Sequence, residues 1–289
     1  MPLLLRPTNR KIRVFVGLTL AVLLAVQCVP SEAFRKEADV AVIEGQPISN
    51  LSVKQLAQIE LWAGSDHIAL LQHCLERYER TVRDYTCTFI KQELINSRTG
   101  KQQTIAVKFR QQPFSVAMAW QVNPPQGDRV LFVEGRYQNQ MLVRPSANWQ
   151  RMIVPSALRP PGGEEAMQNT LRPVTQFGFE RSLRSLMDVY RLAASRGELK
   201  QESGGYARLA DRPAIVLIRT LPERPEYRSA AARTVLYIDL EYLVPVRMEA
   251  YNWDGTQQCA YSYTDVQFNV GLSDDHFQPK ANDMVPPKL

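Results

Sequence analysis

Apolar and polar residues alternate between residues 104 and 143, where short apolar segments are separated by turn residues. A period of two places one row of apolar side chains on one face of a strand, and consecutive segments of this kind predict hairpins. Val130–Val133 and residues 137–143 form a predicted pair around the turn at Glu134-Gly135-Arg136. The apolar positions of the two preceding strands are Ile105, Val107, Phe109, Phe114, Val116, Met118 and Trp120. The pattern predicts an antiparallel meander with one apolar face.

The same strand pattern occurs on both sides of this stretch. One strand begins with Tyr85, Cys87 and Phe89, and Asp254-Gly255 is a hairpin turn between two later segments. The later predicted strands are residues 214–220, 233–240, 244–251 and 257–268. We therefore predict one sheet that extends from Tyr85 to Phe268.

Three segments carry apolar residues at helical spacing. The first, residues 52–63, has Ser52 and Gln55 at capping-box spacing and precedes Gly64. The second begins near Ser65 or Asp66 and ends near residue 83, and the third spans residues 179–195. The apolar stripes are Ile68, Leu71, Leu75, Tyr78 and Val82 on the second helix, and Phe179, Leu183, Leu186, Met187 and Tyr190 on the third. Because an exposed stripe favours association, we expect these helices to pack on the apolar face of the sheet, in an α+β fold.

The first 33 residues have the features of a secretory signal peptide. Basic residues precede the apolar run Val14–Val26, and Ser31-Glu32-Ala33 offers small residues at the positions that a signal peptidase reads. The run is shorter than the ~20 residues of a membrane-spanning helix, although retention as an anchor stays open. We expect cleavage after Ala33, a flexible lead-in over residues 34–50, and one domain over residues 51–283. The protein would then be periplasmic or extracellular.

Cleavage also changes the charge and the cysteine count. It removes four positive charges and one negative charge from the formal +6, which leaves +3 and no block of basic residues. We therefore expect no nucleic-acid partner. Cys74, Cys87 and Cys259 remain, and two interpretations fit them: one disulfide with one free thiol, or three buried apolar side chains.

Residues that could carry catalysis or bind a metal are few, and each group has a structural alternative. Glu164-Glu165 could be an acid and a base, or a solvated pair of carboxylates. Asp274-Asp275 beside His276 could bind a cation, or stabilise the first turn of a short helix. Cys87 with His73 could be a nucleophile and its base, or an inert cysteine near an unrelated histidine. We expect no catalytic residue, cofactor or metal site, and no enzyme activity.

Several of these segments together resemble a known family. They are Val107-Lys108-Phe109-Arg110, Pro113-Phe114, Trp120, the Gly135 turn and the closing Ser273-Asp274-Asp275-His276-Phe277. With YTCTFIKQELINSRTG, VLFVEG and residues 158–180, they resemble a bacterial family of exported proteins of unknown function. That family is similar to the periplasmic lipoprotein-carrier (LolA/LolB/RseB-like) superfamily. The resemblance covers about residues 68–280.

The resemblance implies an unclosed antiparallel half-barrel whose concave, apolar face is covered by helices. It also implies binding of acyl chains or of a lipidated partner, with at most transient membrane association. In such carriers a strand arginine before a proline-phenylalanine turn holds the lid, and Arg110 is the matching position. Arg110 is out of phase with Phe109, however, so in a regular strand it faces away from the apolar row.

Two functions follow from this sequence. The first is lipid or lipoprotein binding by an apolar face that includes Phe109, Phe114, Val116, Met118 and Trp120, with the irregular residues 155–177 as the gate. The alternative is an envelope interaction or sensor module whose core is filled by its own helices. Free volume distinguishes them, because a cavity above roughly 300 Å³ favours the first function.

Overall fold

The computed structural model describes residues 40–43, 47 and 50–286 of the 289-residue chain. The predicted signal peptide and most of the predicted lead-in lie outside these residues. Both stay predictions, as does the domain range 51–283. Within the lead-in, Val40–Ile43 forms strand β1, which pairs with β9 (Lys200–Leu209). An edge strand of this kind is held by backbone hydrogen bonds, so it needs no alternating side-chain pattern.

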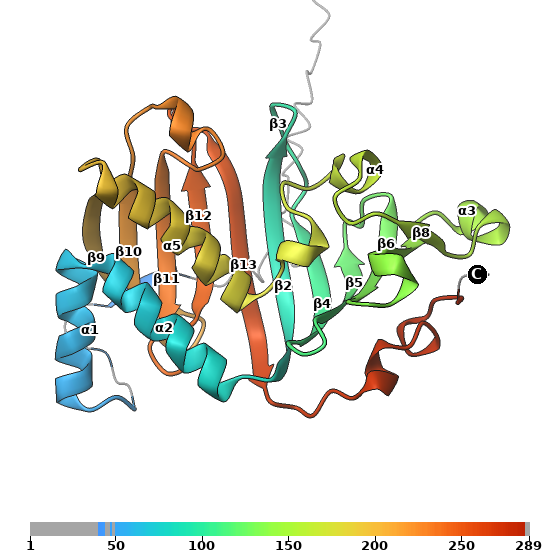
Figure 1. The fold of residues 1–289 in the computed structure, drawn as a ribbon, viewed down its shortest axis with the longest axis horizontal. Helices are drawn as coiled ribbons and strands as arrows, with labels where there is room; N and C mark the ends of the chain where they lie inside the picture. The colour runs from blue at the N-terminus through green and yellow to red at the C-terminus, as the bar shows by residue number, and fades with distance from the viewer. Residues whose placement is uncertain (1–39, 44–46, 48–49, 287–289) are drawn as a thin grey trace, which may run out of the picture. The chain divides into compact units, whose positions relative to one another are not determined.

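The sheet of the described residues contains thirteen strands, and its paired strands are antiparallel (Figure 1). The order is β1-β9-β10-β11-β12-β13-β2-β4-β5-β6-β7-β8, with β3 beside β2. The remaining strands are β2 (Asp84–Ile95), β3 (Arg98–Thr99), β4 (Gln103–Arg110), β5 (Ser115–Val122), β6 (Gly127–Val133), β7 (Met141–Pro145), β8 (Ala157–Arg159), β10 (Arg212–Thr220), β11 (Arg233–Asp239), β12 (Pro245–Tyr251) and β13 (Gln257–Phe268). β1 and β8 are the two edges and do not pair with each other, so the predicted α+β fold with an unclosed antiparallel sheet is confirmed.

The three long helices lie close to where the sequence predicts them. The capping box of the first helix is present, because Ser52 accepts a hydrogen bond from the backbone of Gln55 and the Gln55 side chain accepts one from the backbone of Ser52. The α-helices are α1 (Val53–Ser65), α2 (His67–Thr81), α3 (Asn148–Ile153), α4 (Glu164–Met167) and α5 (Phe179–Ser195). Short 3-10 helices are η2 (Tyr137–Asn139), η3 (Val174–Gln176), η4 (Pro225–Tyr227), η5 (Asp274–Phe277) and η6 (Lys280–Asn282).

The face of the sheet that carries the predicted apolar row is here called the inner face. On it Ile105 of β4 pairs with Trp120 of β5, and Phe109 pairs with Val116. Val107 pairs with Met118 between them. These residues belong to one buried cluster or pack against it, so the predicted strand phase is confirmed.

Helices cover the inner face over only part of the sheet. Figure 1 shows α1, α2 and α5 beside strands β9 to β12, whereas β4 to β6 lie beyond them. Leu71 and Leu75 of α2 and Leu183 of α5 share a buried cluster with Leu217 of β10 and Leu236 of β11. The predicted packing of the helices on the sheet is thus confirmed. The strands that carry Met118 and Trp120 need another cover.

The opposite, outer face of β5 to β7 is covered by the end of the chain. Leu272, Phe277 and Met284 pack there against Leu131 and Leu142. The predicted single turn after Ser273 is present as η5, and Ser273 forms a capping box with His276. The C-terminal segment therefore covers β5 to β7 on the side of the sheet that faces away from the helices.

Two local predictions were wrong. The strand expected over residues 137–143 begins only at Met141, because Tyr137, Gln138 and Asn139 have left-handed backbone angles with φ between 50° and 58°. Strand β9 was not expected, because its Glu-Ser-Gly-Gly stretch lacks apolar alternation. It forms through backbone pairing with both β1 and β10.

Candidate functional site

An open cavity of about 1140 Å³ lies between the inner face of β2 and β4 to β7 and residues 155–177, which are here called the cover segment. The cover segment contains β8, α4 and η3, so the predicted irregular region is broken by short elements. Aliphatic, aromatic and methionine side chains dominate the sheet side of the cavity. They include Phe89, Ile105, Met118, Trp120, Val130, Met141 and Val143. The volume is well above the ~300 Å³ at which ligand pockets begin.

The five residues predicted to form the ligand-binding face divide into two groups. Met118 and Trp120 line the cavity. Phe109, Phe114 and Val116 lie farther along the same face, where they are buried at 2%, 4% and 0% exposure. The apolar row is therefore continuous, but only one end of it borders free space.

An aromatic cluster closes the cavity toward α5. The Phe177 ring at the end of the cover segment lies 5.3 Å from the Phe89 ring and 6.2 Å from the Phe109 ring. Gly178 follows with φ of +111°, and a Cβ there would lie 2.9 Å from the Phe109 ring. Only glycine fits this conformation and this close approach. The chain can therefore pass directly from the cover segment into α5 (Phe179–Ser195).

Four polar residues, three of them buried and Thr170 partly buried, line another part of the cavity and are here called the polar pole. Its members are Lys91, Glu93, Thr170 and Tyr261. Lys91 Nζ lies 2.9 Å from Glu93 Oε2 and donates to Thr170 Oγ1 at 3.0 Å. Tyr261 donates its hydroxyl to Glu93 Oε1 at 2.5 Å, and burial raises the pKa of this phenol well above its ordinary value. The Leu171 backbone N–H donates to the same Glu93 oxygen at 3.3 Å.

Sequence reasoning missed the polar pole, although β2 carries a signal for it. Tyr85, Cys87 and Phe89 define the inward phase of this strand, and Lys91 and Glu93 continue that phase. Charged residues on the apolar side of a strand are rarely buried unless they are paired. Their partners Thr170 and Tyr261 lie far away in sequence, so the pairing itself could not be predicted.

Arg110, the residue expected to hold a lid, points to the outer face. Its guanidinium lies 2.8 Å from Asp274 Oδ1 and 4.9 Å from the centre of the Phe277 ring, and it donates to Ser115 Oγ. The hydrogen bond from Arg110 lowers the pKa of Asp274. Among the contacts of the described residues, Arg110 has none with the cover segment. The lid-holding role implied by the resemblance stays a prediction.

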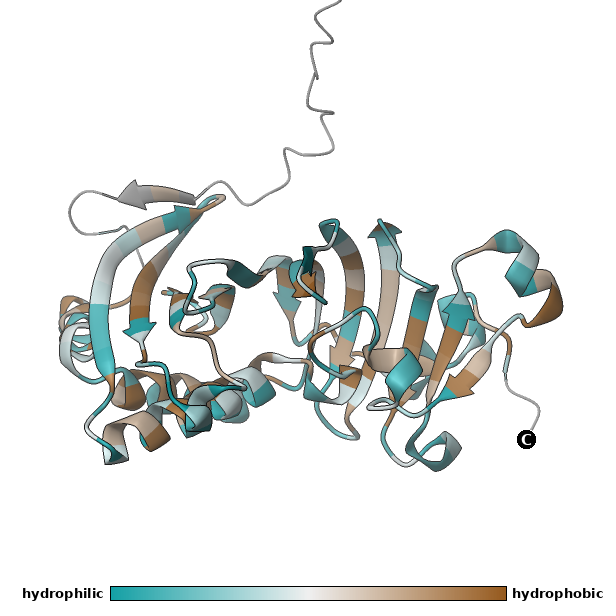
Figure 2. Ribbon diagram, turned by 90° about the horizontal axis from the view of Figure 1, so that it is seen from above, coloured by the Kyte–Doolittle hydropathy of each residue, from teal (hydrophilic) through white to brown (hydrophobic). Residues whose placement is uncertain are grey.

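Exposed apolar side chains gather beside the cavity on and after α3. Trp149, Met152, Ile153 and Val154, here called the apolar tip, are exposed by 65%, 89%, 73% and 44%. Trp149, Ile153 and Val154 also line the cavity, so its apolar lining continues to the surface. In Figure 2, brown (hydrophobic) colour is confined to the C-terminal part of α3 and the residues after it, and the rest of this short helix is mostly teal.

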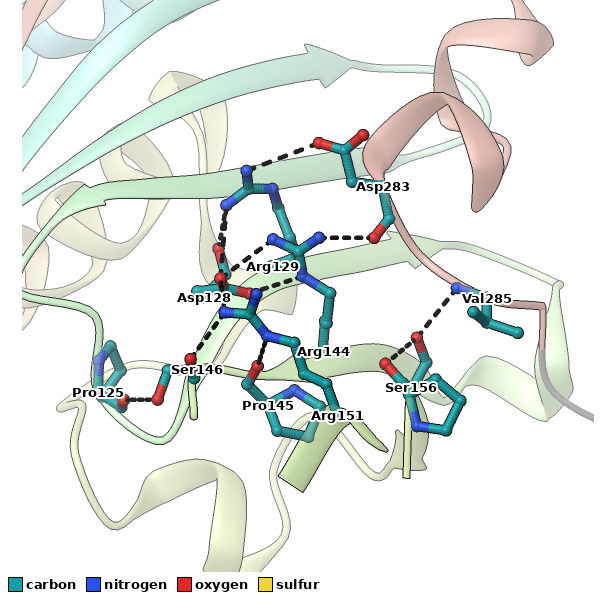
Figure 3. A network of polar contacts seen from close by, with 11 residues as sticks. Pro125, Asp128, Arg129, Arg144, Pro145, Ser146, Arg151, Ser156, Asp283 and Val285 are labelled. Carbon is teal, nitrogen blue, oxygen red and sulfur yellow. Dashed lines mark hydrogen bonds and ion pairs between the residues drawn. The ribbon is translucent and has the colours of Figure 1, made fainter. Parts of the chain in front are cut away.

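The base of the apolar tip is fixed by Arg151 (Figure 3). Its guanidinium lies 2.5 Å from Asp128 Oδ2 and donates to the carbonyl oxygens of Pro145 and Ser146. Arg144 binds the same carboxylate through both its Nε and a terminal nitrogen. The short helix is thus anchored through its polar side while its apolar side stays exposed.

The alternatives weighed for catalysis and metal binding have structural explanations. The buried thiol of Cys87 has a raised pKa because of desolvation, which disfavours the nucleophilic thiolate. Glu165 forms an ion pair with Arg159. All three cysteines of the described chain are free and buried. Among the residues that the structure describes, no three His, Cys, Asp or Glu side chains are grouped so that they could hold a metal ion. No described helix is long and apolar enough to cross a membrane.

Comparisons with known proteins give a family and distant structures. The family model described as "Protein of unknown function (DUF1571)" matches residues 82–285. No curated protein matches the sequence. The Pseudomonas aeruginosa MucA/MucB complex contains a chain with 17% identity and a TM-score of 0.46, and the match covers 78% of this chain and 64% of that one.

Two further solved structures match with lower identity. A LolA superfamily protein from Nitrosomonas europaea has 12% identity and a TM-score of 0.30, with coverage of 73% of this chain and 98% of that one. The lipoprotein LppX of Mycobacterium tuberculosis has 12% identity and a TM-score of 0.41, with coverage of 71% and 96%. The chain spans less than two thirds of the length of the MucB chains that it matches.

Proposed function

This chain belongs to the DUF1571 family of proteins of unknown function, and we propose from its cavity that it is an exported, non-enzymatic protein that binds lipid acyl chains. The observation that carries the proposal is the cavity of about 1140 Å³ with its apolar sheet side. Each methylene removed from water contributes ~0.8 kcal/mol, so even a medium-length chain would gain useful affinity. The acyl chain could belong to a free lipid or to a lipidated protein.

Met118 and Trp120 are the predicted binding residues that would contact the ligand directly. Met141 and Met248 also line the cavity, and methionine adapts its shape to irregular apolar surfaces. Phe109 and Val116 would not contact the ligand. They would instead hold in place the sheet that carries Trp120. We thus divide the predicted apolar row into a binding end and a packing end.

The cover segment would control entry to the cavity. The polar pole ties it to the sheet, because Lys91 binds Thr170 and Glu93 binds the Leu171 backbone. The holding role that the resemblance implied for Arg110 would then belong to Lys91 and Glu93 for this segment. Arg110 would instead hold the C-terminal segment through Asp274.

The apolar tip would give transient access to a membrane. Trp149 and Ile153 are both exposed and part of the cavity lining, so an acyl chain could pass from a bilayer to the cavity along a continuous apolar surface. Tryptophan is favoured at membrane–water interfaces, which fits this position. The alternative function, a sensor module with a filled core, is less well supported because the cavity is open.

Native mass spectrometry of protein purified from its own envelope fraction tests this proposal. We expect an added mass that corresponds to a bound lipid and that is lost after denaturation. A protein that carries no lipid, and that also fails to bind added fatty acid, would contradict the proposal. In that case the module would become the better account.

A further inference from the structure

The charges that line the cavity do not cancel. Five charged side chains belong to the lining: Lys91, Glu93, Arg159, Glu165 and Arg172. Lys91 pairs with Glu93, and Arg159 pairs with Glu165. Within the described ranges, Arg172 forms no ion pair and no side-chain hydrogen bond. The cavity therefore has an excess of one positive charge, and this charge is at Arg172.

Arg172 lies next to the polar pole. It follows Leu171, whose N–H donates to Glu93, and it is two residues from Thr170, which accepts from Lys91. Burial raises the pKa of Cys259 to about 11, and the charge of Arg172 opposes that rise, as it does for Tyr261 and Tyr263. The positive charge of Arg172 therefore favours the ionised form of three side chains of β13.

The polar and apolar parts of the lining meet at this point. On β2, Phe89 immediately precedes Lys91 on the inner face, and on β13, Tyr263 follows Tyr261 in the same way. The Phe89 and Tyr263 rings lie 4.9 Å apart. A ligand with a polar end beside Arg172 would therefore have its chain on an aromatic surface. The site could therefore bind the polar end of an amphiphile through Arg172 and its apolar chain through the aromatic rings.

We propose, on the basis of the proposed function, that the cavity selects amphiphiles with an anionic head group, a carboxylate or a phosphate ester, which Arg172 binds. The chain of the ligand lies along Phe89 and Trp120. Lys91 is not the anion ligand, because Glu93 neutralises its charge and Thr170 accepts a further hydrogen bond from its ammonium group. A neutral head group leaves Arg172 without a partner, and a cationic one is repelled.

Displacement of a neutral, environment-sensitive dye tests this selectivity with three probes of equal chain length: dodecanoate, dodecyl phosphate and 1-dodecanol. The intact protein should bind both anions about three- to fivefold more tightly than the alcohol, as a partly exposed ion pair allows. Arg172→Gln should abolish the difference and leave the affinity for the alcohol unchanged. Arg172→Lys should retain part of it. Arg208→Gln is the matched control, because Arg208 is exposed on β9 and outside the cavity.

Added salt and inorganic phosphate complete the test. Anion binding by the intact protein should weaken as ionic strength rises, whereas alcohol binding should not. Inorganic phosphate at the probe concentration should not displace the dye, because it has no chain. Equal affinity for the three probes, or an equal loss of all three in Arg172→Gln, would overturn the inference and leave the proposed function intact. Failure of all three probes to bind the intact protein would overturn both.

Discussion

Lys91 and Glu93 are two residues apart on one strand, so both side chains point to the inner face, where their charged atoms lie 2.9 Å apart. Their side chains are only 9% and 5% exposed. Each also binds the cover segment, Lys91 through Thr170 and Glu93 through the Leu171 backbone. One buried ion pair therefore connects the sheet to the cover segment.

Glu93→Gln should be strongly destabilising. The change leaves the Lys91 ammonium buried without its counter-charge, and breaking a buried pair in this way costs about 3–5 kcal/mol. Chemical denaturation measures the loss. Glu165→Gln is the control, because its pair with Arg159 is exposed and should contribute below about 1 kcal/mol. The double change Lys91→Met with Glu93→Leu should recover much of the stability. A Glu93→Gln protein as stable as the Glu165→Gln protein would contradict this account of the pair.

Trp120→Ala should affect binding more than stability. Trp120 borders the cavity and is only partly buried, so we expect a loss of about 1–2 kcal/mol, below the ~3–5 kcal/mol of a fully packed aromatic residue. Phe109→Ala should show that larger loss, because Phe109 is 2% exposed and packed against other rings. Unfolding and the binding of a fluorescent fatty acid should be measured on both variants. Weak binding by Trp120→Ala with near-normal stability supports the carrier function, and the reverse result speaks for a filled core.

The pH dependence of stability should reveal His67. Burial lowers its pKa below the ordinary 6.5, because the imidazole is fully buried, and the hydrogen bond between its Nε2 and the Ala63 carbonyl oxygen opposes this shift only in part. The unfolded chain then binds a proton that the folded protein disfavours, so stability should be fully present above about pH 6.5 and fall as the pH drops below it. His67→Phe should flatten this slope. His73→Gln should also flatten the slope, because desolvation lowers the pKa of His73 too. The effect should be smaller than that of His67→Phe, because His73 is only half-buried. An unchanged slope in His67→Phe would show that another group is responsible.

The apolar tip should be needed for membrane contact but not for folding. Met152→Ser with Ile153→Ser removes two side chains that are 89% and 73% exposed, so the melting temperature should stay within the error of the measurement. Flotation with phosphatidylglycerol–phosphatidylcholine vesicles should show less bound protein. Leu61→Ser changes a residue that is 61% exposed on α1, away from the cavity, and should leave flotation unchanged. Equal flotation of all three proteins would exclude a special role for the tip.

Local properties of this fold could be predicted from the sequence, and long-range ones could not. The phase of Phe109 and Val116 follows from the period of two, because alternation is a property of each strand by itself. The polar pole depends on Tyr261, which is 168 residues away from Glu93. The left-handed turn at Tyr137–Asn139 has no glycine to indicate it. The position of Arg110 on the outer face was foreseeable from its phase, but its partner Asp274 was not.

The cavity itself is the central claim, and filling it is the most direct test. Val130 and Val143 face each other across β6 and β7 in the lining, so Val130→Trp should occupy free volume without disturbing a packed core. Val122→Trp is the matched control, because Val122 lies at the exposed end of β5 and outside the cavity. Titration with a fluorescent fatty acid should show binding by the intact protein and by Val122→Trp, and at least about tenfold weaker binding by Val130→Trp at unchanged stability. Equal binding by all three proteins would contradict the claim that the cavity holds the acyl chain.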